Sequence, residues 1–571
     1  MRIKRNFFSI ALILCFLILT SAGCGGGGSD DVAPPPPEPI SISIGTTSSR
    51  VWVGQTLQFS AHVEGDGSHA VAWGVEGAGC TSNACGTIDT SGLYTTPATL
   101  TVANIVVRGT SVADPTKSAT APLVLLAPAL DRLQGQYVFL LEGYLTNGEI
   151  MHMGGVFAAD GNGALSGLLD GVLSSSVINQ QAFTGDYTLS TENRGHIVVG
   201  YPGDSFNFSY VLNAAGDRGY VISFDDSDIR AAGMLLKQNL SAYPSAGDYA
   251  FLFRGENGAV GRVHLDSGGN LEGTASLLNG GDWVAYGSQV NGSYESYSNG
   301  SGNGTIHFGF GDAHCRVYVI DANNMLWLSL DPQGSGFGRL TGELAKQSGG
   351  PFDTSMVNGT YILAMSGVVY QSNFTHSMVG RLALDGSGAI SGAYDYNDHG
   401  TIELSVPVTT TGGMSTYNVS ADGLVDFGLD AKPYHGVLVS PDRALFLTEY
   451  AFDHYGFLTG WWERQSEGPF DNGSPAGVSA YGNESFTSNA APLLQCGVAR
   501  LDGHGQLNMI EDENSFGRPV ADAEATTTYS VSADGRFTAE SMVGYEISPT
   551  RLVIFNADPQ DSAPQLLQAK Q

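Results

Sequence analysis

The sequence predicts an all-β protein in which a β-sandwich is followed by four antiparallel modules in tandem. Three observations support this fold class. Apolar and polar residues alternate over most of the chain, as they do in strands with one buried face. Clusters of Gly, Asp, Asn and Ser separate these runs at hairpin spacing. The chain also repeats itself, and its 571 residues are too many for a single core.

The chain begins with a segment that has the three parts of an export signal. Basic residues at positions 2, 4 and 5 precede an apolar run over residues 7–19, and small residues follow. The run is too short for a comfortable transmembrane span. The residues Ser21-Ala22-Gly23-Cys24 resemble the lipobox of bacterial lipoproteins, although that family usually has leucine where this chain has Ser21.

The resemblance implies a lipoprotein signal peptide over residues 1–23 and acylation of the Cys24 thiol. Two or three acyl chains hold a protein stably on a membrane. Gly25 stands where enteric lipoproteins retained in the inner membrane carry aspartate, so the resemblance implies an outer-membrane lipoprotein, facing either the periplasm or the cell surface. An ordinary secretory signal is the alternative. Residues 24–39, CGGGGSDDVAPPPPEP, are predicted to be a lipidated Gly/Pro-rich tether.

Residues 40–127 form the predicted sandwich, because apolar side chains alternate with polar ones between Gly and Ser turns. Its short motifs are Val53-Gly54-Gln55-Thr56 with Phe59, Val71-Ala72-Trp73, Gly86-Thr87-Ile88, Ser91-Gly92-Leu93-Tyr94 and Thr110-Ser111-Val112-Ala113-Asp114. With these residues the region resembles a bacterial Ig-like domain of the group 2 type. The resemblance implies a two-sheet spacer or adhesion module without catalysis.

Four related modules are predicted at residues 131–238, 242–347, 351–465 and 468–571. The clearest internal match pairs TYNVSADGLV at 416–425 with TYSVSADGRF at 528–537. Each module has an Asp/Gly turn, beginning at residues 160, 266, 385 and 502. A second turn falls in register between the last long strands, at residues 213, 322, 440 and 548.

About eight strand-like runs with hairpin-length connections predict an antiparallel meander in each module. A small closed barrel is the preferred arrangement, because closure removes exposed strand edges. An open two-sheet sandwich is the alternative. A propeller is disfavoured, since no self-similarity is found at half the module length. No amphipathic helix is predicted after the signal.

Charge and cysteine content limit the partners and the compartment. Asp and Glu number 56 against 25 Lys and Arg, so nucleic acid is an improbable partner and direct adsorption on anionic lipid is equally disfavoured. Cys80 and Cys85 are close enough for a local disulfide in an exported protein. Cys315 and Cys496 lie in separate modules and are predicted to be buried free thiols, with a bond between them as the alternative.

The sequence carries no recognisable catalytic motif. It lacks a Gly-x-Ser-x-Gly elbow, a His-Glu-x-x-His zinc motif and a phosphate-gripping glycine loop. No catalytic residue, cofactor or metal ligand is therefore predicted. The Asp/Gly segments are interpreted as tight turns rather than calcium loops. In Met151-His152-Met153, alternation along a strand places His152 on the face opposite its neighbours, which disfavours a soft-metal site.

The third module is the best candidate for ligand binding because it concentrates aromatic and hydrogen-bonding side chains. Tyr396, His399, Tyr455, Trp461 and Trp462 are the candidate ligand-binding residues, and core packing is the alternative. If Trp461 and Trp462 lie on a strand, they point in opposite directions.

The resulting hypothesis is a cell-envelope lipoprotein that displays tandem β modules for binding or adhesion. Its partners would be the membrane, through the lipid anchor, and a glycan, a small ligand or a neighbouring protein. A purely structural spacer is the alternative, and an undetected hydrolase is a third hypothesis.

Overall fold

The computed structural model describes residues 39–571, except 47, 66–68, 174–175, 202–203, 280–281, 310, 333–335, 370–373, 399, 410–414, 450–455, 484–492, 516 and 559–565. The predicted signal peptide, Cys24 and nearly all of the tether lie outside these residues. The described part contains strands and two short 3-10 turns, η1 (Leu130–Arg132) and η2 (Thr354–Met356). None of its helices is long and apolar enough to cross a membrane. The chain divides into two compact units, which meet between Pro128 and Ala129 in the sequence.

The N-terminal unit is a sandwich of two four-stranded sheets, in the orders β1-β3-β6-β5 and β2-β8-β7-β4. Phe59 and Tyr94 fill its core, and Gly92 lies so close to the Phe59 carbonyl that a Cβ would stand 2.5 Å from it. Cys80 and Cys85 form a disulfide. The strands are β1 (Ser41–Thr46), β2 (Arg50–Trp52), β3 (Thr56–Glu64), β4 (Val71–Glu76), β5 (Thr87–Ile88), β6 (Leu93–Thr95), β7 (Asn104–Ser111) and β8 (Ser118–Leu126).

The C-terminal unit contains four antiparallel modules, and the first two are closed eight-stranded barrels. The prediction of all-β meander modules is thus confirmed. Module 1 consists of β9 (Gln134–Leu145), β10 (Ile150–Asp160), β11 (Ala164–Leu173), β12 (Ser176–Tyr187), β13 (Arg194–Tyr201), β14 (Asp204–Leu212), β15 (Arg218–Ser223) and β16 (Ile229–Lys237). Module 2 consists of β17 (Gly247–Gly255), β18 (Asn257–Leu265), β19 (Asn270–Asn279), β20 (Asp282–Ser296), β21 (Ser301–His307), β22 (Asp312–Val319), β23 (Asn324–Ser329) and β24 (Leu340–Lys346).

Modules 3 and 4 are rolled sheets of nine strands, because the fourth strand of the barrels is here divided in two. Module 3 consists of β25 (Asn358–Val369), β26 (Phe374–Asp385), β27 (Ile390–Asp398), β28 (Thr401–Pro407), β29 (Thr416–Val419), β30 (Leu424–Leu429), β31 (Lys432–Ser440), β32 (Arg443–Glu449) and β33 (Gly456–Arg464). Module 4 consists of β34 (Gly477–Asn483), β35 (Leu493–Leu501), β36 (Gln506–Ser515), β37 (Arg518–Thr528), β38 (Ser530–Val531), β39 (Arg536–Ala539), β40 (Met542–Ser548), β41 (Arg551–Asn556) and β42 (Leu566–Lys570).

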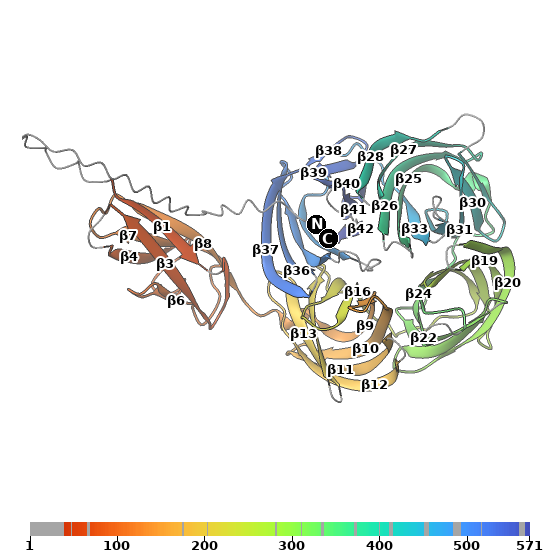
Figure 1. Ribbon diagram of the computed structural model, residues 1–571, viewed down its shortest axis with the longest axis horizontal. Helices are drawn as coiled ribbons and strands as arrows, with labels where there is room; N and C mark the ends of the chain where they lie inside the picture. The colour runs from red at the N-terminus through yellow and green to blue at the C-terminus, as the bar shows by residue number, and fades with distance from the viewer. Residues whose placement is uncertain are drawn as a thin grey trace, which may run out of the picture. The chain divides into compact units, whose positions relative to one another are not determined.

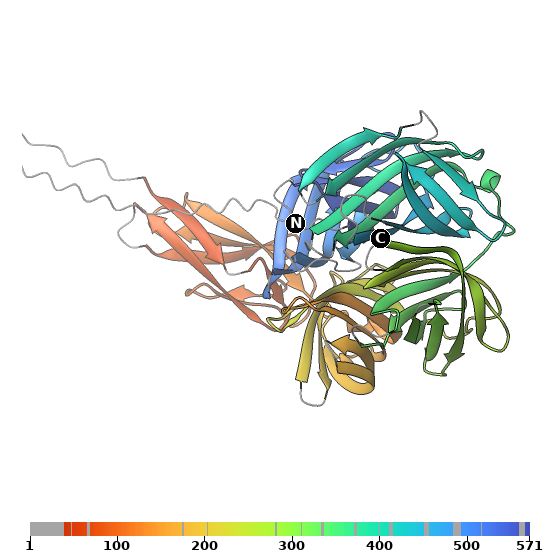
Figure 2. The same ribbon diagram turned by 45° about the vertical axis from the view of Figure 1, so that its right-hand side comes forward.

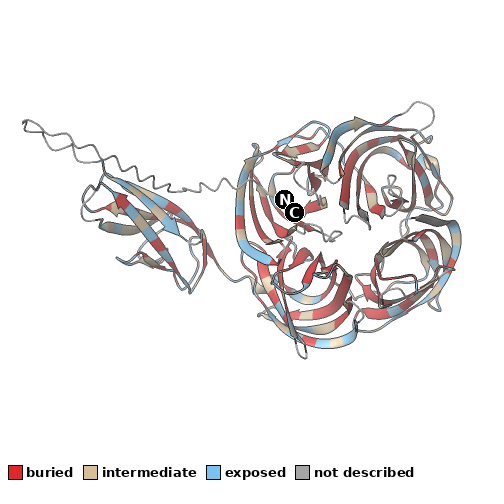
Figure 3. Ribbon diagram, in the orientation of Figure 1, coloured by how far each residue is buried: buried red, intermediate tan, exposed pale blue. Residues whose placement is uncertain are grey.

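Side chains fill the interior of each module. On β14, Phe206, Phe208, Tyr210 and Leu212 all enter the core of module 1, as their period-2 spacing predicts. Comparable clusters occupy modules 2, 3 and 4. Figure 3 shows buried positions alternating with more exposed ones along the strands.

The Asp/Gly segments are tight turns in all four modules. In module 3 the Oδ1 atom of Asp385 accepts hydrogen bonds from the backbone N–H of Ser387 at 2.8 Å and of Ala389 at 2.9 Å. Tyr417, at the start of the next sheet segment, donates its backbone N–H to the Gly388 carbonyl. The Asp oxygens that a calcium loop would use are thus engaged by the turn itself.

The four modules form a ring in chain order (Figures 1 and 2). Apolar clusters join module 1 to 2, 2 to 3, 3 to 4 and 4 to 1. A glutamine near the end of each of the first three modules also reaches into the next one. Gln465 illustrates this contact, because its Nε2 donates to the carbonyls of Asp534 at 2.9 Å and Glu546 at 2.8 Å. Gln238 and Gln347 make the same contacts one and two modules earlier.

Buried Asp–Arg pairs strengthen three of the four junctions. Asp170, Asp395 and Asp512 occupy the same position at a β-bulge in the third strand of modules 1, 3 and 4. Each pairs with an arginine of the following module, namely Arg316, Arg536 and Arg194. The last of these pairs closes the ring, because Arg194 belongs to module 1.

Candidate functional site: a cavity at the centre of the ring

A cavity of about 420 Å³ lies where the four modules meet. Its volume falls within the range of small-molecule binding sites. Every module contributes side chains from its first strand or its last two strands. The ionisable side chains of the lining are Glu142, Arg218, Arg254, Asp321, Glu343, Arg443, Glu463, Arg551 and Lys570. The lining thus carries five basic and four acidic groups, in a chain whose net charge is −31.

Four residues at equivalent positions of the four modules line the cavity. They are the first residues of β15, β23, β32 and β41, which are the second-last strands of their modules. Three are arginines and the fourth is an asparagine: Arg218, Asn324, Arg443 and Arg551. Each follows the turn that falls in register among the four repeats, so the repeat itself brings the guanidinium groups together.

Two glutamates neutralise part of this arginine group. Nη2 of Arg443 lies 3.1 Å from both carboxylate oxygens of Glu343, which belongs to module 2. Glu463 lies between two arginines: its Oε1 is 3.5 Å from Nε of Arg443, and its Oε2 accepts a short hydrogen bond from Nη1 of Arg551. Burial raises the pKa of Glu343, but the nearby Arg443, Arg254 and Arg218 outweigh burial and hold the pKa below its usual value.

A second charged group lies at the junction of modules 1 and 2. Nε of Arg254 donates to both oxygens of the buried Glu142, at 3.1 and 2.9 Å, and the Thr341 hydroxyl donates to the same carboxylate. His152 is fully buried beside this pair, and burial lowers its pKa to about 4. Its neighbours Met151 and Met153 point into the module 1 core, as strand alternation predicts.

Arg551 lines the cavity between Trp461 and Gln568. Its guanidinium packs on the indole ring of Trp461, with Cζ 4.8 Å from the ring centroid, and Nη2 donates to Gln568 at 3.2 Å. Its Nε has no hydrogen-bond partner among the described residues. Burial, together with the positive charges of Arg443 and Arg218, lowers the pKa of Arg551 to about 9.

The structure separates the predicted ligand-binding residues of module 3. Trp462 is fully buried in the module core against Tyr361, Phe427 and Phe446. Trp461 points the other way and lines the cavity, so the predicted divergence of the two tryptophans is confirmed. Tyr396 is half-buried on β27, and its ring stacks with His376 at 5.6 Å. His399 and Tyr455 lie outside the described residues.

The other predicted cysteine sites are distributed over both units. The Cys80–Cys85 disulfide lies in the sandwich, and Cys315 and Cys496 are buried free cysteines in modules 2 and 4. Cys24 lies outside the described residues. Among the residues that the structure describes, no group of three or more His, Cys, Asp or Glu is arranged to hold a metal ion.

Among the described residues, apolar side chains pack the interior of each module. A second cavity, inside module 4 between Tyr481, Met509 and Phe537, has a volume of about 30 Å³. That volume suits a single water molecule. The cavity at the centre of the ring is therefore the better binding site.

The sequence analysis did not predict that three arginines line one cavity, although the sequence contains a signal for them. Turns at residues 213, 322, 440 and 548 fall in register, and arginine follows three of them within five residues. Aligning these positions groups Arg218, Arg443 and Arg551. The alignment does not show that the modules form a ring, and only this arrangement brings the three side chains near one another.

Comparison with known proteins does not assign the chain to a family. The chain matches no protein-family model and no curated protein. The functional argument therefore proceeds from the geometry of the cavity.

Proposed function

We propose that the protein is a ligand-binding lipoprotein of the cell envelope and that its binding site is the cavity at the centre of the ring. One observation carries this proposal: all four modules direct charged side chains at a single cavity, to which module 3 adds Trp461, while apolar clusters pack their own interiors. The volume lies within the range of small-molecule sites, and the lining combines apolar side chains with nine ionisable ones.

The spacer hypothesis predicts a different use of these residues. A spacer needs contacts between neighbouring modules, and the apolar clusters and Asp–Arg pairs already provide them at the junctions. The charged side chains around the cavity also form ion pairs between modules, such as Arg443 with Glu343, but Arg218, Arg443 and Arg551 lie near one another there at a cost in Coulomb energy. A protein that only needed rigidity would gain by replacing them with apolar residues.

The test is a thermal-shift screen of a small-metabolite library on the mature full-length protein. Ser366 lines the cavity on β25, so Ser366→Trp should fill it and abolish the shift produced by any ligand. Ser391→Trp is the matched control, because Ser391 lies on the exposed face of β27 in the same module. A ligand that binds both variants equally would exclude the cavity, and a screen without any ligand would favour the spacer.

Attachment to the envelope rests on the lipobox-like residues before Cys24. We propose that Cys24 is acylated and that residues 25–39 hold the folded units away from the membrane. Labelling cells with an alkyne fatty acid should mark the unaltered protein but not Cys24→Ser. Mass spectrometry of the mature N-terminus is a second measurement, and an unacylated Cys24 would disprove the anchor while leaving the binding site untouched.

A further inference from the structure

We infer that Glu546 makes the junction between modules 3 and 4 sensitive to pH, so that this junction tightens in acid and loosens towards neutral pH. The inference concerns the ring itself and goes beyond the proposed binding site.

The position of Glu546 in the fold is the first argument. On β40 it directly faces Leu552 of β41, which belongs to the apolar core of module 4. The backbone N–H of Glu546 donates to the Gly535 carbonyl at 2.8 Å. The residues that make the equivalent bond in modules 1, 2 and 3 are Leu212, Val319 and Leu438. All three belong to their module cores, so module 4 has a carboxyl group where the other modules have leucine or valine.

The surroundings of the Glu546 carboxyl group are the second argument. The residue is 0% exposed, and neither Oε1 nor Oε2 has a hydrogen-bond partner among the described residues. An ionised carboxylate that is buried without a cation or a hydrogen-bond donor is strongly disfavoured. Burial and the negative charge of Asp471 raise the pKa of Glu546 to about 7. When the side chain is exposed to water, its pKa is about 4.3.

Other charged groups on the elements around Glu546 are engaged elsewhere. They are Arg381 on β26, Asp534 in the turn before β39, Arg536 on β39 and Arg551 on β41. Their partners are, in the same order, Gln465, Ser532, Asp395 and Glu463. The two arginines on the strands beside β40 are thus paired with carboxylates of module 3 and not with Glu546.

The strand that carries Glu546 also holds module 3, and this is the third argument. The Glu546 carbonyl accepts a hydrogen bond from Nε2 of Gln465 at 2.8 Å, and the Ile547 carbonyl accepts one from the Ser466 N–H at 2.8 Å. The side chains of Tyr545 and Ile547 belong to the apolar cluster between the two modules. Charging Glu546 therefore disfavours the packing of the strand on which the junction depends.

The direction of the effect follows from the two protonation states. The closed junction holds a proton on Glu546 that an open form, with the side chain in water, releases at lower pH. The stabilisation of the closed form is therefore complete below about pH 4, declines as the pH rises to about 7 and is constant above. Trp461 and Arg551 meet across this junction and line the central cavity, so the pH acts on one wall of the cavity.

The test is hydrogen–deuterium exchange of the mature full-length protein at pH 5, 6 and 7, corrected for intrinsic exchange rates and read at single amides by mass spectrometry. The Ser466 amide reports on the junction of modules 3 and 4. The Ser348 amide is the matched control, because it donates to the Val439 carbonyl at 2.9 Å in the junction of modules 2 and 3, next to Leu438. From pH 7 to pH 5 the protection of Ser466 should rise by about tenfold or more, and that of Ser348 should not. Equal changes at the two amides would overturn the inference.

Two variants assign the effect to the carboxyl group. Glu546→Leu introduces the residue of modules 1 and 3, and Glu546→Gln keeps the shape without an ionisable proton. Both should remove the rise in Ser466 protection, whereas Glu467→Gln, at an exposed acid of the same linker, should keep it. Glu546→Gln decides the question even if Glu546→Leu does not fold. If Glu546 weakened the core only by its polarity, Glu546→Leu would raise the protection of Ser466 equally at every pH, and the inference would be wrong.

Discussion

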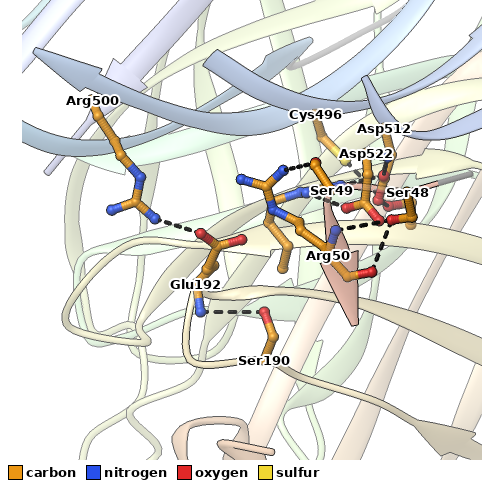
Figure 4. Close-up of polar contacts among 11 residues, drawn as sticks. Ser48, Ser49, Arg50, Ser190, Glu192, Cys496, Arg500, Asp512 and Asp522 are labelled. Atoms are coloured by element: carbon orange, nitrogen blue, oxygen red, sulfur yellow. Dashed lines mark hydrogen bonds and ion pairs between the residues drawn. The ribbon is translucent and has the colours of Figure 1, made fainter. Parts of the chain in front are cut away.

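Asp512 of module 4 forms a buried ion pair with Arg194 of module 1, and this pair joins the last module of the chain to the first. Figure 4 labels Asp512 and Asp522 at this junction. The Asp512 carboxylate also accepts hydrogen bonds from the Ser209 hydroxyl and from the backbone N–H of Asp522 at 3.0 Å. All three of these groups donate hydrogen bonds to the carboxylate. The pair lies at the junction that closes the ring, beside the apolar cluster of modules 4 and 1.

Removing one partner of this pair should therefore be costly. Arg194→Met leaves the Asp512 carboxylate buried without its cation, which typically costs about 3–5 kcal/mol. Urea denaturation should show a correspondingly lower midpoint for the C-terminal unit. Arg500→Met is the matched control, because Arg500 forms the more exposed pair with Glu192 across the same junction, at 2.9 Å. Exposed pairs contribute about 0–1 kcal/mol, so equal effects of the two variants would contradict the special role of Arg194.

The glutamine contact between modules 3 and 4 explains a glycine in the repeat. Gly535 has a φ of +86°, and a Cβ on it would stand 2.5 Å from Nε2 of Gln465. Gly300 and Gly423 leave the same space for Gln238 and Gln347. In module 1, which has no preceding module to dock a glutamine, the equivalent position is Asn193, also with a positive φ of 64°.

Gly535→Ala should destabilise the C-terminal unit both by backbone strain and by this collision. Gly309→Ala isolates the strain, because Gly309 has nearly the same φ, +88°, and no atom within 4 Å of a Cβ. Strain alone costs about 1–2 kcal/mol. Gly535→Ala should lower the urea midpoint further than Gly309→Ala, and adding Gln465→Ala should make the excess smaller. Equal midpoints for the two alanine variants would show that the Gln465 side chain moves away from the new methyl group without loss of stability.

Sequence periodicity predicted the content of each module well. Alternation placed Phe206, Phe208 and Tyr210 in one core and separated Trp461 from Trp462, because these outcomes depend only on the local pleat of a strand.

The central cavity depends instead on contacts between residues far apart in the chain. Arg551 and Trp461 meet because module 4 packs against module 3, and no local pattern specifies that contact. The junction arginines do not share one position either: Arg194 and Arg536 are the first residues of the equivalent strands β13 and β39, whereas Arg316 lies within β22, so no single spacing locates all three.

Glu511 should make the stability of the C-terminal unit fall as pH rises. The side chain is buried, the Tyr481 hydroxyl donates to its Oε2, and burial with the nearby Glu513 raises its pKa to about 8. In the unfolded chain the pKa of glutamate is about 4.3, so the folded state holds a proton that the unfolded state releases between these two values. The contribution of Glu511 to stability therefore declines from about pH 4 to about pH 8 and is constant above.

Glu511→Gln has no proton to release and should remove this decline. The melting temperature of the variant, compared with that of the unaltered protein, should rise steadily between pH 5 and pH 8. Differential scanning calorimetry at several pH values measures the difference directly. Parallel curves for the two proteins would mean that Glu511 is ionised in the folded state.

The disulfide between Cys80 and Cys85 should stabilise the N-terminal sandwich alone. The two cysteines are five positions apart, and a loop this short yields about 2 kcal/mol in the chain-entropy model. Cys85 is buried, and its carbonyl accepts a hydrogen bond from the Tyr94 hydroxyl at 2.6 Å, so the segment keeps an anchor without the bond. Calorimetry of a Cys80→Ser, Cys85→Ser double variant should show a lower transition for the sandwich. The transition of the four-module unit serves as the internal control in the same scan, because the two units are separately compact. An equal shift of both transitions, or none in the sandwich, would contradict the prediction.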